Sequence, residues 1–143
     1  MKQHLTETQS RLYQNILRDL GKISEFLQDD DVNEIMVNSN RKMYIDTASR
    51  GLVYIEDVPK DQTLRLIQSL ADYSGQTINR TTQYVTLEMP IHGCMNGERF
   101  TAQIPPLTPL PSFTLRKKPK VVFPMESYVE SGRMTQYLFD SLV

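Results

Sequence analysis

The spacing of apolar residues changes from helical to strand-like early in the chain, and this change constrains the fold more than any other feature. Between residues 12 and 27 apolar side chains recur every three or four positions, which places them on one face of an amphipathic helix. Thr6 and Gln9 have the spacing of a capping box at its start, and Gly21 interrupts the pattern. The acidic run 29–31 favours a turn, because Asp competes for backbone hydrogen bonds. We therefore expect the helical pattern to end there.

Short β-favouring runs follow this boundary. Residues 35–37, 43–45 and 52–55 are separated by polar turns, which predicts an antiparallel meander. A second helical pattern opens at Pro59 and is expected to stop at Gly75. The residues expected to share its buried face are Leu64, Ile67, Leu70 and Ala71.

The third section carries a hairpin signal and an alternating strand. Asn96 and Gly97 form the dipeptide that most often supplies a two-residue hairpin turn, so we expect the turn there. Beyond it, apolar residues alternate with polar ones from Arg99 onward, which predicts that Arg99 points away from the core. Four prolines interrupt regular structure before a last strand that Arg116 closes. The apolar positions of these two strands are Phe100, Ala102, Ile104, Phe113 and Leu115.

These patterns predict an α+β domain with helices packed on one face of a largely antiparallel sheet. The chain has 143 residues, about one domain on the usual ~100–200 residues each. Its 16 Lys and Arg balance 17 Asp and Glu, which excludes a general polyanion-binding tail. Because Cys94 is the only cysteine and no apolar run reaches the ~18 residues of a membrane span, we expect a reducing, cytoplasmic setting.

Short signatures of a self-sufficient active site are missing from the sequence. It contains no GxxxxGK(S/T), GxGxxG, GxSxG or HExxH motif, so the chain by itself is not expected to be an enzyme. His92 and Cys94 lie close together, but the further ligands of a zinc site are absent, and we interpret them as a strand or turn pair. The acidic pairs are interpreted as solvated loop charge.

Four motifs in order carry a family resemblance. They read DVNEIMVN (31–38), GERFTAQIPP (97–106), PSFTLRKKP (111–119) and MESYVESGRMT (125–135). The chain resembles the N-terminal domain of secretion traffic ATPases, and most closely the TrbB-like, conjugative-transfer branch of the type IV secretion ATPases. That resemblance implies a PAS-like N-terminal domain over 1–116, and a linker with the first helical segment of a RecA-like catalytic domain over 117–143.

The resemblance also implies a function for the longer protein. It implies a homo-hexameric bacterial ATPase that uses ATP with Mg for transport or pilus assembly. It further implies a cytoplasmic protein, peripheral at the inner membrane, that contacts other secretion-system components, and it implies no sequence-specific nucleic-acid binding. Nucleotide would lie between this domain and the RecA-like domain, with Arg99 and Arg116 reaching its phosphates. The phosphate loop would follow the present sequence, so we expect no ATP hydrolysis or tight cofactor binding by this chain alone.

Alternative interpretations remain open at this point. Without the resemblance, Arg99 is a solvent-facing strand residue and Arg116 a strand-end cation. Lys117 follows directly where relatives carry a single basic residue, so the sequence leaves open which cation approaches phosphate. The whole chain could instead be the equivalent domain of a type II secretion or pilus ATPase, or a free-standing PAS-like sensor or interaction module.

Overall fold

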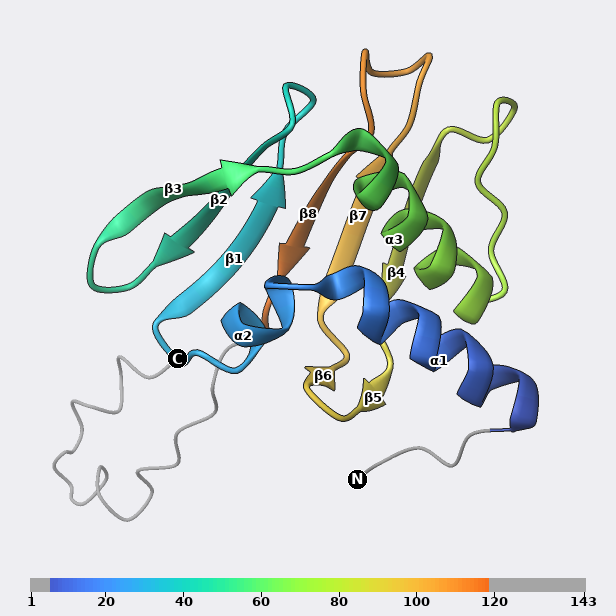
Figure 1. The fold of residues 1–143 in the computed structure, drawn as a ribbon, viewed down its shortest axis with the longest axis horizontal. Coiled ribbons are helices and arrows are strands. Elements are labelled where there is room, and N and C mark those ends of the chain that lie inside the picture. Colours follow the sequence, from blue (N-terminus) through green and yellow to red (C-terminus); the bar gives the residue numbers. More distant parts are fainter. Residues whose placement is uncertain (1–5, 119–143) are drawn as a thin grey trace, which may run out of the picture.

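The structure, a computed structural model, describes residues 6–118 of the chain. Except for Lys117 and Lys118, the predicted linker and helical segment over 117–143 therefore lie outside the described residues. The described part holds three helices, a six-stranded sheet and a small two-stranded ribbon (Figure 1).

The N-terminal helical pattern forms two helices, α1 (Glu7–Leu20) and α2 (Ile23–Leu27). The predicted capping box is confirmed: the Thr6 hydroxyl accepts from the Gln9 amide N–H at 3.1 Å, and the Thr6 N–H donates to Gln9 Oε1 at 3.2 Å. Gly21 separates the helices with φ 53°, a left-handed value that glycine adopts without a Cβ penalty. Within residues 6–118 no helix combines the length and the apolar character needed to cross a bilayer.

The predicted meander is confirmed as β1 (Val32–Val37), β2 (Lys42–Thr47) and β3 (Gly51–Asp57). Helix α3 (Lys60–Tyr73) follows, and three more strands complete the main sheet. These strands are β4 (Tyr84–Glu88), β7 (Arg99–Gln103) and β8 (Ser112–Arg116). The strand order is β3-β2-β1-β8-β7-β4, and every neighbouring pair is antiparallel.

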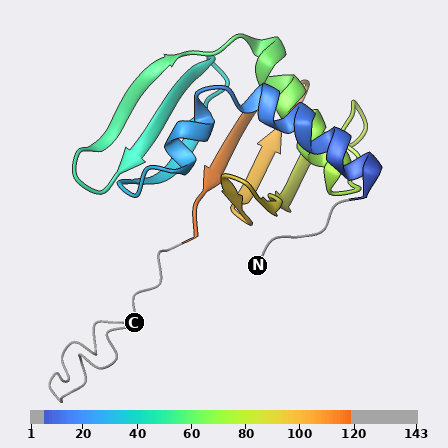
Figure 2. The same ribbon diagram turned by 60° about the horizontal axis from the view of Figure 1, so that its bottom comes forward.

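All three helices lie on the same side of this sheet (Figure 2), so the predicted α+β class with helices on one face is confirmed. The core between the two layers contains fully buried side chains from both, among them Ile16, Leu20, Ile35, Phe100 and Leu115. The predicted buried face of α3 is wrong at one residue. Leu64 is 39% exposed, and Leu66 fills the core instead because it lies one turn before Leu70 on the buried face.

The expected turn at Asn96 and Gly97 is also wrong. Asn96 ends the short strand β6 (Met95–Asn96), which pairs with β5 (Ile91–His92). The turn between these strands is made by Gly93, at φ 62°, with Cys94. Among the described residues outside glycine only Arg41 has a positive φ, so Asn96 does not adopt the conformation of a type I′ turn. The strands β4 and β7 still pair, through a longer connection.

Candidate functional site

Arg99 and Arg116 are direct partners in the main sheet. Arg99 begins β7 and Arg116 ends β8, and because these strands are antiparallel the two Cα positions face each other in register. Both side chains are exposed on the face that carries no helix, while their neighbours Phe100 and Leu115 are fully buried. Directly opposed residues in such a pair have Cβ atoms about 4.5–5.5 Å apart. The structure therefore brings both predicted site residues together.

Two carboxylates flank this arginine pair in the same row of the sheet. Glu88 of β4 is the register partner of Arg99, and Glu34 of β1 is the register partner of Arg116. Like charges placed directly opposite destabilise a sheet, and the acidic neighbours on either side offset that repulsion. The row thus reads acidic, basic, basic, acidic across four strands.

The two arginines differ in their contacts. Arg116 donates from both Nε and Nη2 to the same Glu34 oxygen, Oε2, at 3.3 Å each. Arg99 has no ion-pair partner within residues 6–118. Its guanidinium donors consequently stay available to a ligand.

The arginine pair lines a hollow of about 220 Å³ on the open face of the sheet. Its other lining residues are Glu88, Gly97, Lys117 and Lys118. Gly97 has φ 74°, and a Cβ there would lie 3.0 Å from the Lys118 ammonium nitrogen, so this glycine lets Lys118 approach closely. Arg99, Arg116 and Lys118 together give the hollow an excess of positive charge suited to an anion.

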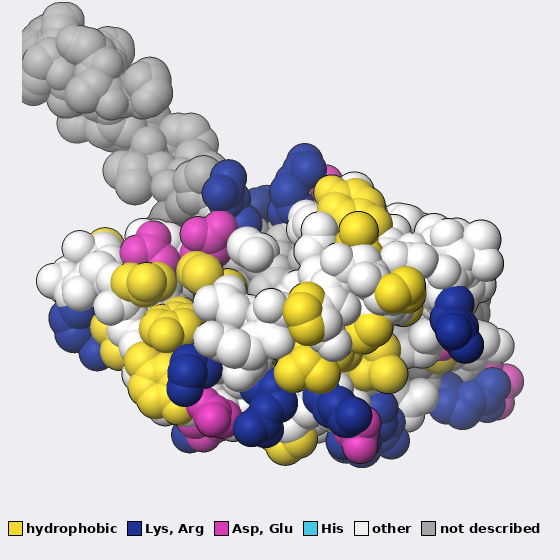
Figure 3. Space-filling model, turned by 90° about the horizontal axis from the view of Figure 1, so that it is seen from above, with side chains coloured by type: hydrophobic (Ala, Val, Ile, Leu, Met, Phe, Trp, Pro, Cys, Tyr) yellow, Lys and Arg dark blue, Asp and Glu magenta, His cyan; other side chains and the backbone are white. Residues whose placement is uncertain are grey.

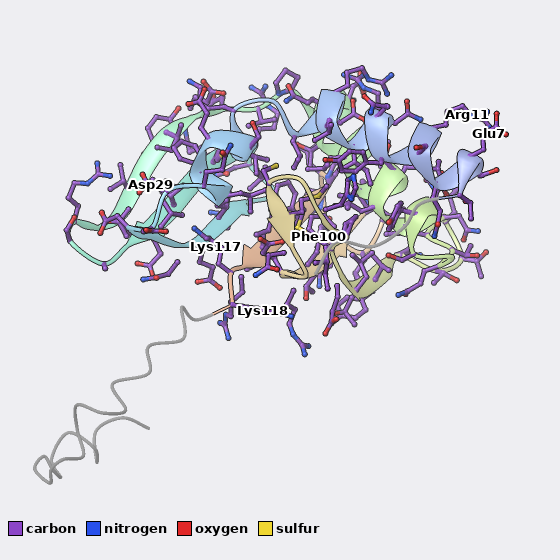
Figure 4. All side chains as sticks on the ribbon, turned by 90° about the horizontal axis from the view of Figure 1, so that it is seen from below. Glu7, Arg11, Asp29, Phe100, Lys117 and Lys118 are labelled. Carbon is purple, nitrogen blue, oxygen red and sulfur yellow. The ribbon has the colours of Figure 1, made fainter. Side chains whose placement is uncertain are left out.

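Lys117 takes a structural position instead. Its ammonium donates to the main-chain oxygens of Asp29 at 2.8 Å and Phe26 at 3.4 Å, at the end of α2. Figure 4 shows Lys117 directed towards the segment that carries Asp29, with Lys118 on the side of the sheet away from the helices. A cation at a helix C-terminus meets the unpaired carbonyls and the negative end of the helix dipole. These contacts favour Arg116 over Lys117 as the cation that reaches a ligand.

The other surfaces suit an anion less well. A second hollow of about 390 Å³ lies on the open face towards the other end of β7 and β8, and its lining side chains carry no charge. Seen from above, basic and acidic side chains are mixed along the helix-bearing side (Figure 3). The residues lining the second hollow are Val37, Asn38, Ser39, Thr101, Gln103, Thr108, Ser112, Phe113 and Thr114.

Within residues 6–118 no group of three or more His, Cys, Asp or Glu could hold a metal ion.

Sequence reasoning missed two acidic residues of this region. Glu34 lies in the DVNEIMVN motif, and its place beside buried Ile35 puts it on the open face. Glu98 is 3% exposed, and its side chain accepts from the Asn96 N–H at 2.8 Å. The alternation that places Phe100 inside also places Glu98 inside, so the signal was present in the sequence.

The interpretation of His92 and Cys94 as a strand or turn pair agrees with the structure. His92 ends β5, and its ring meets Tyr13 edge-on with centroids 4.6 Å apart. Burial raises the pKa of the Tyr13 hydroxyl above its usual value. The ring contact between His92 and Tyr13 packs the ribbon against α1, away from the arginine pair.

Comparison with known proteins agrees with the sequence motifs. No protein-family model matches the chain. It is 28% identical over 127 residues to a probable conjugal transfer protein TrbB from Sinorhizobium fredii, and equally to a conjugal transfer protein TrbB from Rhizobium radiobacter. Each alignment covers 88% of this chain, which spans only 38% of the relative's length. The predicted resemblance to TrbB proteins is thereby confirmed.

The fold also matches a solved structure. The crystal structure of the VirB11 ATPase from the Brucella suis type IV secretion system, in complex with sulphate, superposes with a TM-score of 0.73. The match covers 95% of this chain and 40% of the VirB11 chain at 20% sequence identity. At that identity the similarity shows the fold, and the α+β arrangement described above is the shared feature.

Proposed function

We propose that this chain is the N-terminal domain of a type IV secretion ATPase and that Arg99 and Arg116 contact nucleotide phosphates across an interdomain cleft. The similarity to TrbB proteins and to a VirB11 ATPase supports the class of protein. Because the chain spans 38% of its TrbB relatives, the catalytic phosphate loop, its lysine and the Mg ligand are assigned to a RecA-like domain of the longer protein.

The observation that carries the proposal is the cross-strand position of Arg99 and Arg116 on a sheet face without helices. A guanidinium is always charged and presents a planar fork of donors that matches phosphate oxygens. Two such groups on adjacent strands can reach oxygens of one phosphate or of two neighbouring phosphates. The VirB11 structure of similar fold is a complex with sulphate, a tetrahedral oxyanion like phosphate.

The remaining parts of the proposal concern the longer protein. Residues 1–116 form the N-terminal domain, and residues 117–143 lead into the catalytic domain. The protein assembles as a homo-hexamer with this domain in one ring, uses ATP with Mg, and works in the cytoplasm at the bacterial inner membrane with other secretion components. The position of Lys117 and Lys118 beside the hollow supports a cleft between the two domains at this place.

The proposal is tested by ATP hydrolysis in the longer protein. Arg99→Ala and Arg116→Ala should each lower kcat strongly, by up to ~10³-fold if the arginine acts in the transition state. Arg116→Lys keeps the charge and loses the bidentate fork, so it separates charge from geometry. Arg50→Ala, which removes an exposed arginine from the turn before β3, is the matched control and should retain activity. Wild-type hydrolysis by both site variants would refute the phosphate contact.

A further inference from the structure

Glu34 contacts the Arg116 guanidinium along one edge only. Both Arg116 Nε and Nη2 donate to one oxygen of Glu34, at 3.3 Å each. The Glu34 side chain is 20% exposed and that of Arg116 is 70% exposed, so the carboxylate is the more fixed partner. The main chain reinforces this contact, because the two residues are register partners in β1 and β8.

The contact with Glu34 leaves the Nη1–Nη2 edge of the Arg116 guanidinium available to a ligand. A guanidinium carries five N–H donors in a fixed plane. Glu34 takes the Nε–H and one Nη2–H, so both Nη1–H groups and the other Nη2–H remain. The Nη1 and Nη2 pair is an edge that can bind an oxyanion with two parallel hydrogen bonds. Glu34 therefore need not leave for Arg116 to bind phosphate.

The second flanking carboxylate provides an internal contrast. Glu88 occupies the equivalent place beside Arg99, one strand away in the same row. Within residues 6–118 Glu88 forms no ion pair with Arg99, and it lines the hollow, whereas Glu34 is not among the lining residues. Glu34 and Glu88 thus resemble each other in charge and in register, and they differ in whether they orient an arginine.

We propose that Glu34 is a positioning residue for phosphate recognition, which fixes the Arg116 guanidinium by one edge and turns its other edge towards the ligand. This inference rests on the proposed function of the arginine pair. A purely electrostatic argument predicts the opposite effect. Glu34 is an anion beside an anion site, and a competing carboxylate would weaken binding of the ligand. Preorganisation of a long, flexible side chain acts in the other direction, because less freedom is lost when the ligand binds.

The test uses the 143-residue chain with inorganic tripolyphosphate as the probe, titrated calorimetrically and by NMR. Glu34→Ala should weaken binding by about 2- to 5-fold, the upper range of an exposed ion pair. Glu34→Gln, which keeps an acceptor oxygen without the charge, should fall between wild type and Glu34→Ala. The contrasting variant Glu88→Gln removes a carboxylate that lines the hollow and orients no arginine, so it should bind the probe more tightly than wild type, opposite to the Glu34 variants. The Arg116 Nε–H signal should broaden in Glu34→Ala before any probe is added, while the melting temperature stays within a few degrees.

The outcomes separate this inference from the proposed function. If Arg99→Ala and Arg116→Ala lose tripolyphosphate binding but both Glu34 variants bind like wild type or tighter, the inference is overturned and the proposed function stands. Because the chain alone is expected to bind no cofactor tightly, the titration extends to ~10 mM probe, where even weak binding is visible. If wild type shows no binding at that concentration, or the two arginine variants bind like wild type, the phosphate-contact assignment fails and the role of Glu34 fails with it.

Discussion

The two faces of β7 and β8 use alternate residues of the same strands for different purposes. Phe100 and Leu115 are fully buried under the helices, whereas Arg99 and Arg116, their immediate neighbours, are exposed on the other face. Successive side chains of a strand point to opposite faces, so one residue step separates the core from the candidate site. Substitutions on the covered face should therefore change stability, and substitutions on the open face should change binding.

The largest expected effect is on the covered face, from Phe100→Ala. Phe100 is 0% exposed and packs against Phe113 with ring centroids 5.1 Å apart. Removing a buried Phe side chain typically costs about 3–5 kcal/mol, a large share of the ~5–15 kcal/mol stability of a small domain. Thermal unfolding followed by circular dichroism should show a fall of more than about 10 °C. A melting temperature within a few degrees of wild type would mean that this face does not form the core.

On the open face, the double variant Arg99→Ala and Arg116→Ala should have the opposite profile. Exposed substitutions usually change stability by under ~0.5 kcal/mol, and this one also removes a repulsion between like charges. The melting temperature should stay within a few degrees, while tripolyphosphate binding falls at least about tenfold, because each charge-assisted contact is worth ~1.5 kcal/mol or more. Unfolding of the double variant would assign the pair to the structure and not to a ligand.

The neighbouring residues Lys117 and Lys118 allow the same comparison one step along the chain. Lys117→Met removes the two hydrogen bonds to the main chain at the end of α2 and should cost about 1 kcal/mol of stability. Lys118→Met removes a cation of the hollow, so it should weaken tripolyphosphate binding with little change in stability. Chemical denaturation and the binding titration measure the two effects. Equal behaviour of the two variants would contradict their separate roles.

The smallest effect is expected at the edge strand β3, where the exposed Asp57 carboxylate has a hydrogen-bond partner, Tyr54, and an ion-pair partner, Lys42. The Tyr54 hydroxyl donates to Asp57 at 2.7 Å, and this hydrogen bond, followed by the nearby Lys42 ammonium, lowers the pKa of Asp57. A lowered folded-state pKa contributes stability above the unfolded-state pKa of 3.8, and this is lost as pH falls through the folded-state pKa.

Tyr54→Phe should therefore raise the pKa of Asp57 and reduce the loss of stability on acidification. An NMR titration of the Asp57 carboxyl carbon measures this shift directly. Tyr84→Phe, which removes an exposed tyrosine hydroxyl from β4 at the opposite edge of the sheet, serves as the control and should leave the pKa of Asp57 as in wild type. An unchanged pKa of Asp57 in the variant would show that the hydroxyl does not hold this carboxylate.

Local patterns predicted most of the fold. The capping box at Thr6, the break at Gly21 and the alternation around Phe100 depend on residues close in sequence, and the structure confirms them. The predicted turn at Asn96 and Gly97 was wrong because Asn96 pairs with Ile91 in a two-stranded ribbon, which packs against α1 through His92 and Tyr13. Tertiary packing there overrode a strong local preference.

The site was predictable only in part, because its geometry depends on strand register. Alternation placed Arg99 and Arg116 on the open face, but it could not show that they face each other across β7 and β8. Glu34 meets Arg116 across 82 positions of sequence, because β1 and β8, the first and last strands along the chain, are neighbours in the sheet. No local pattern contains that pairing, so the role of Glu34 became visible only in the folded chain.

The most direct measurement is a titration of the 143-residue chain with tripolyphosphate, followed through the Nε–H signals of its arginines and the side-chain amide of Gln103. If the arginine pair binds phosphate, the Arg99 and Arg116 signals should shift together and saturate with one affinity. The Arg50 signal, from the turn before β3, and the Gln103 signal, at the uncharged end of β7, should stay in place. Shifts spread equally over all arginines, or no shift at Arg99 and Arg116, would contradict a phosphate site on this face.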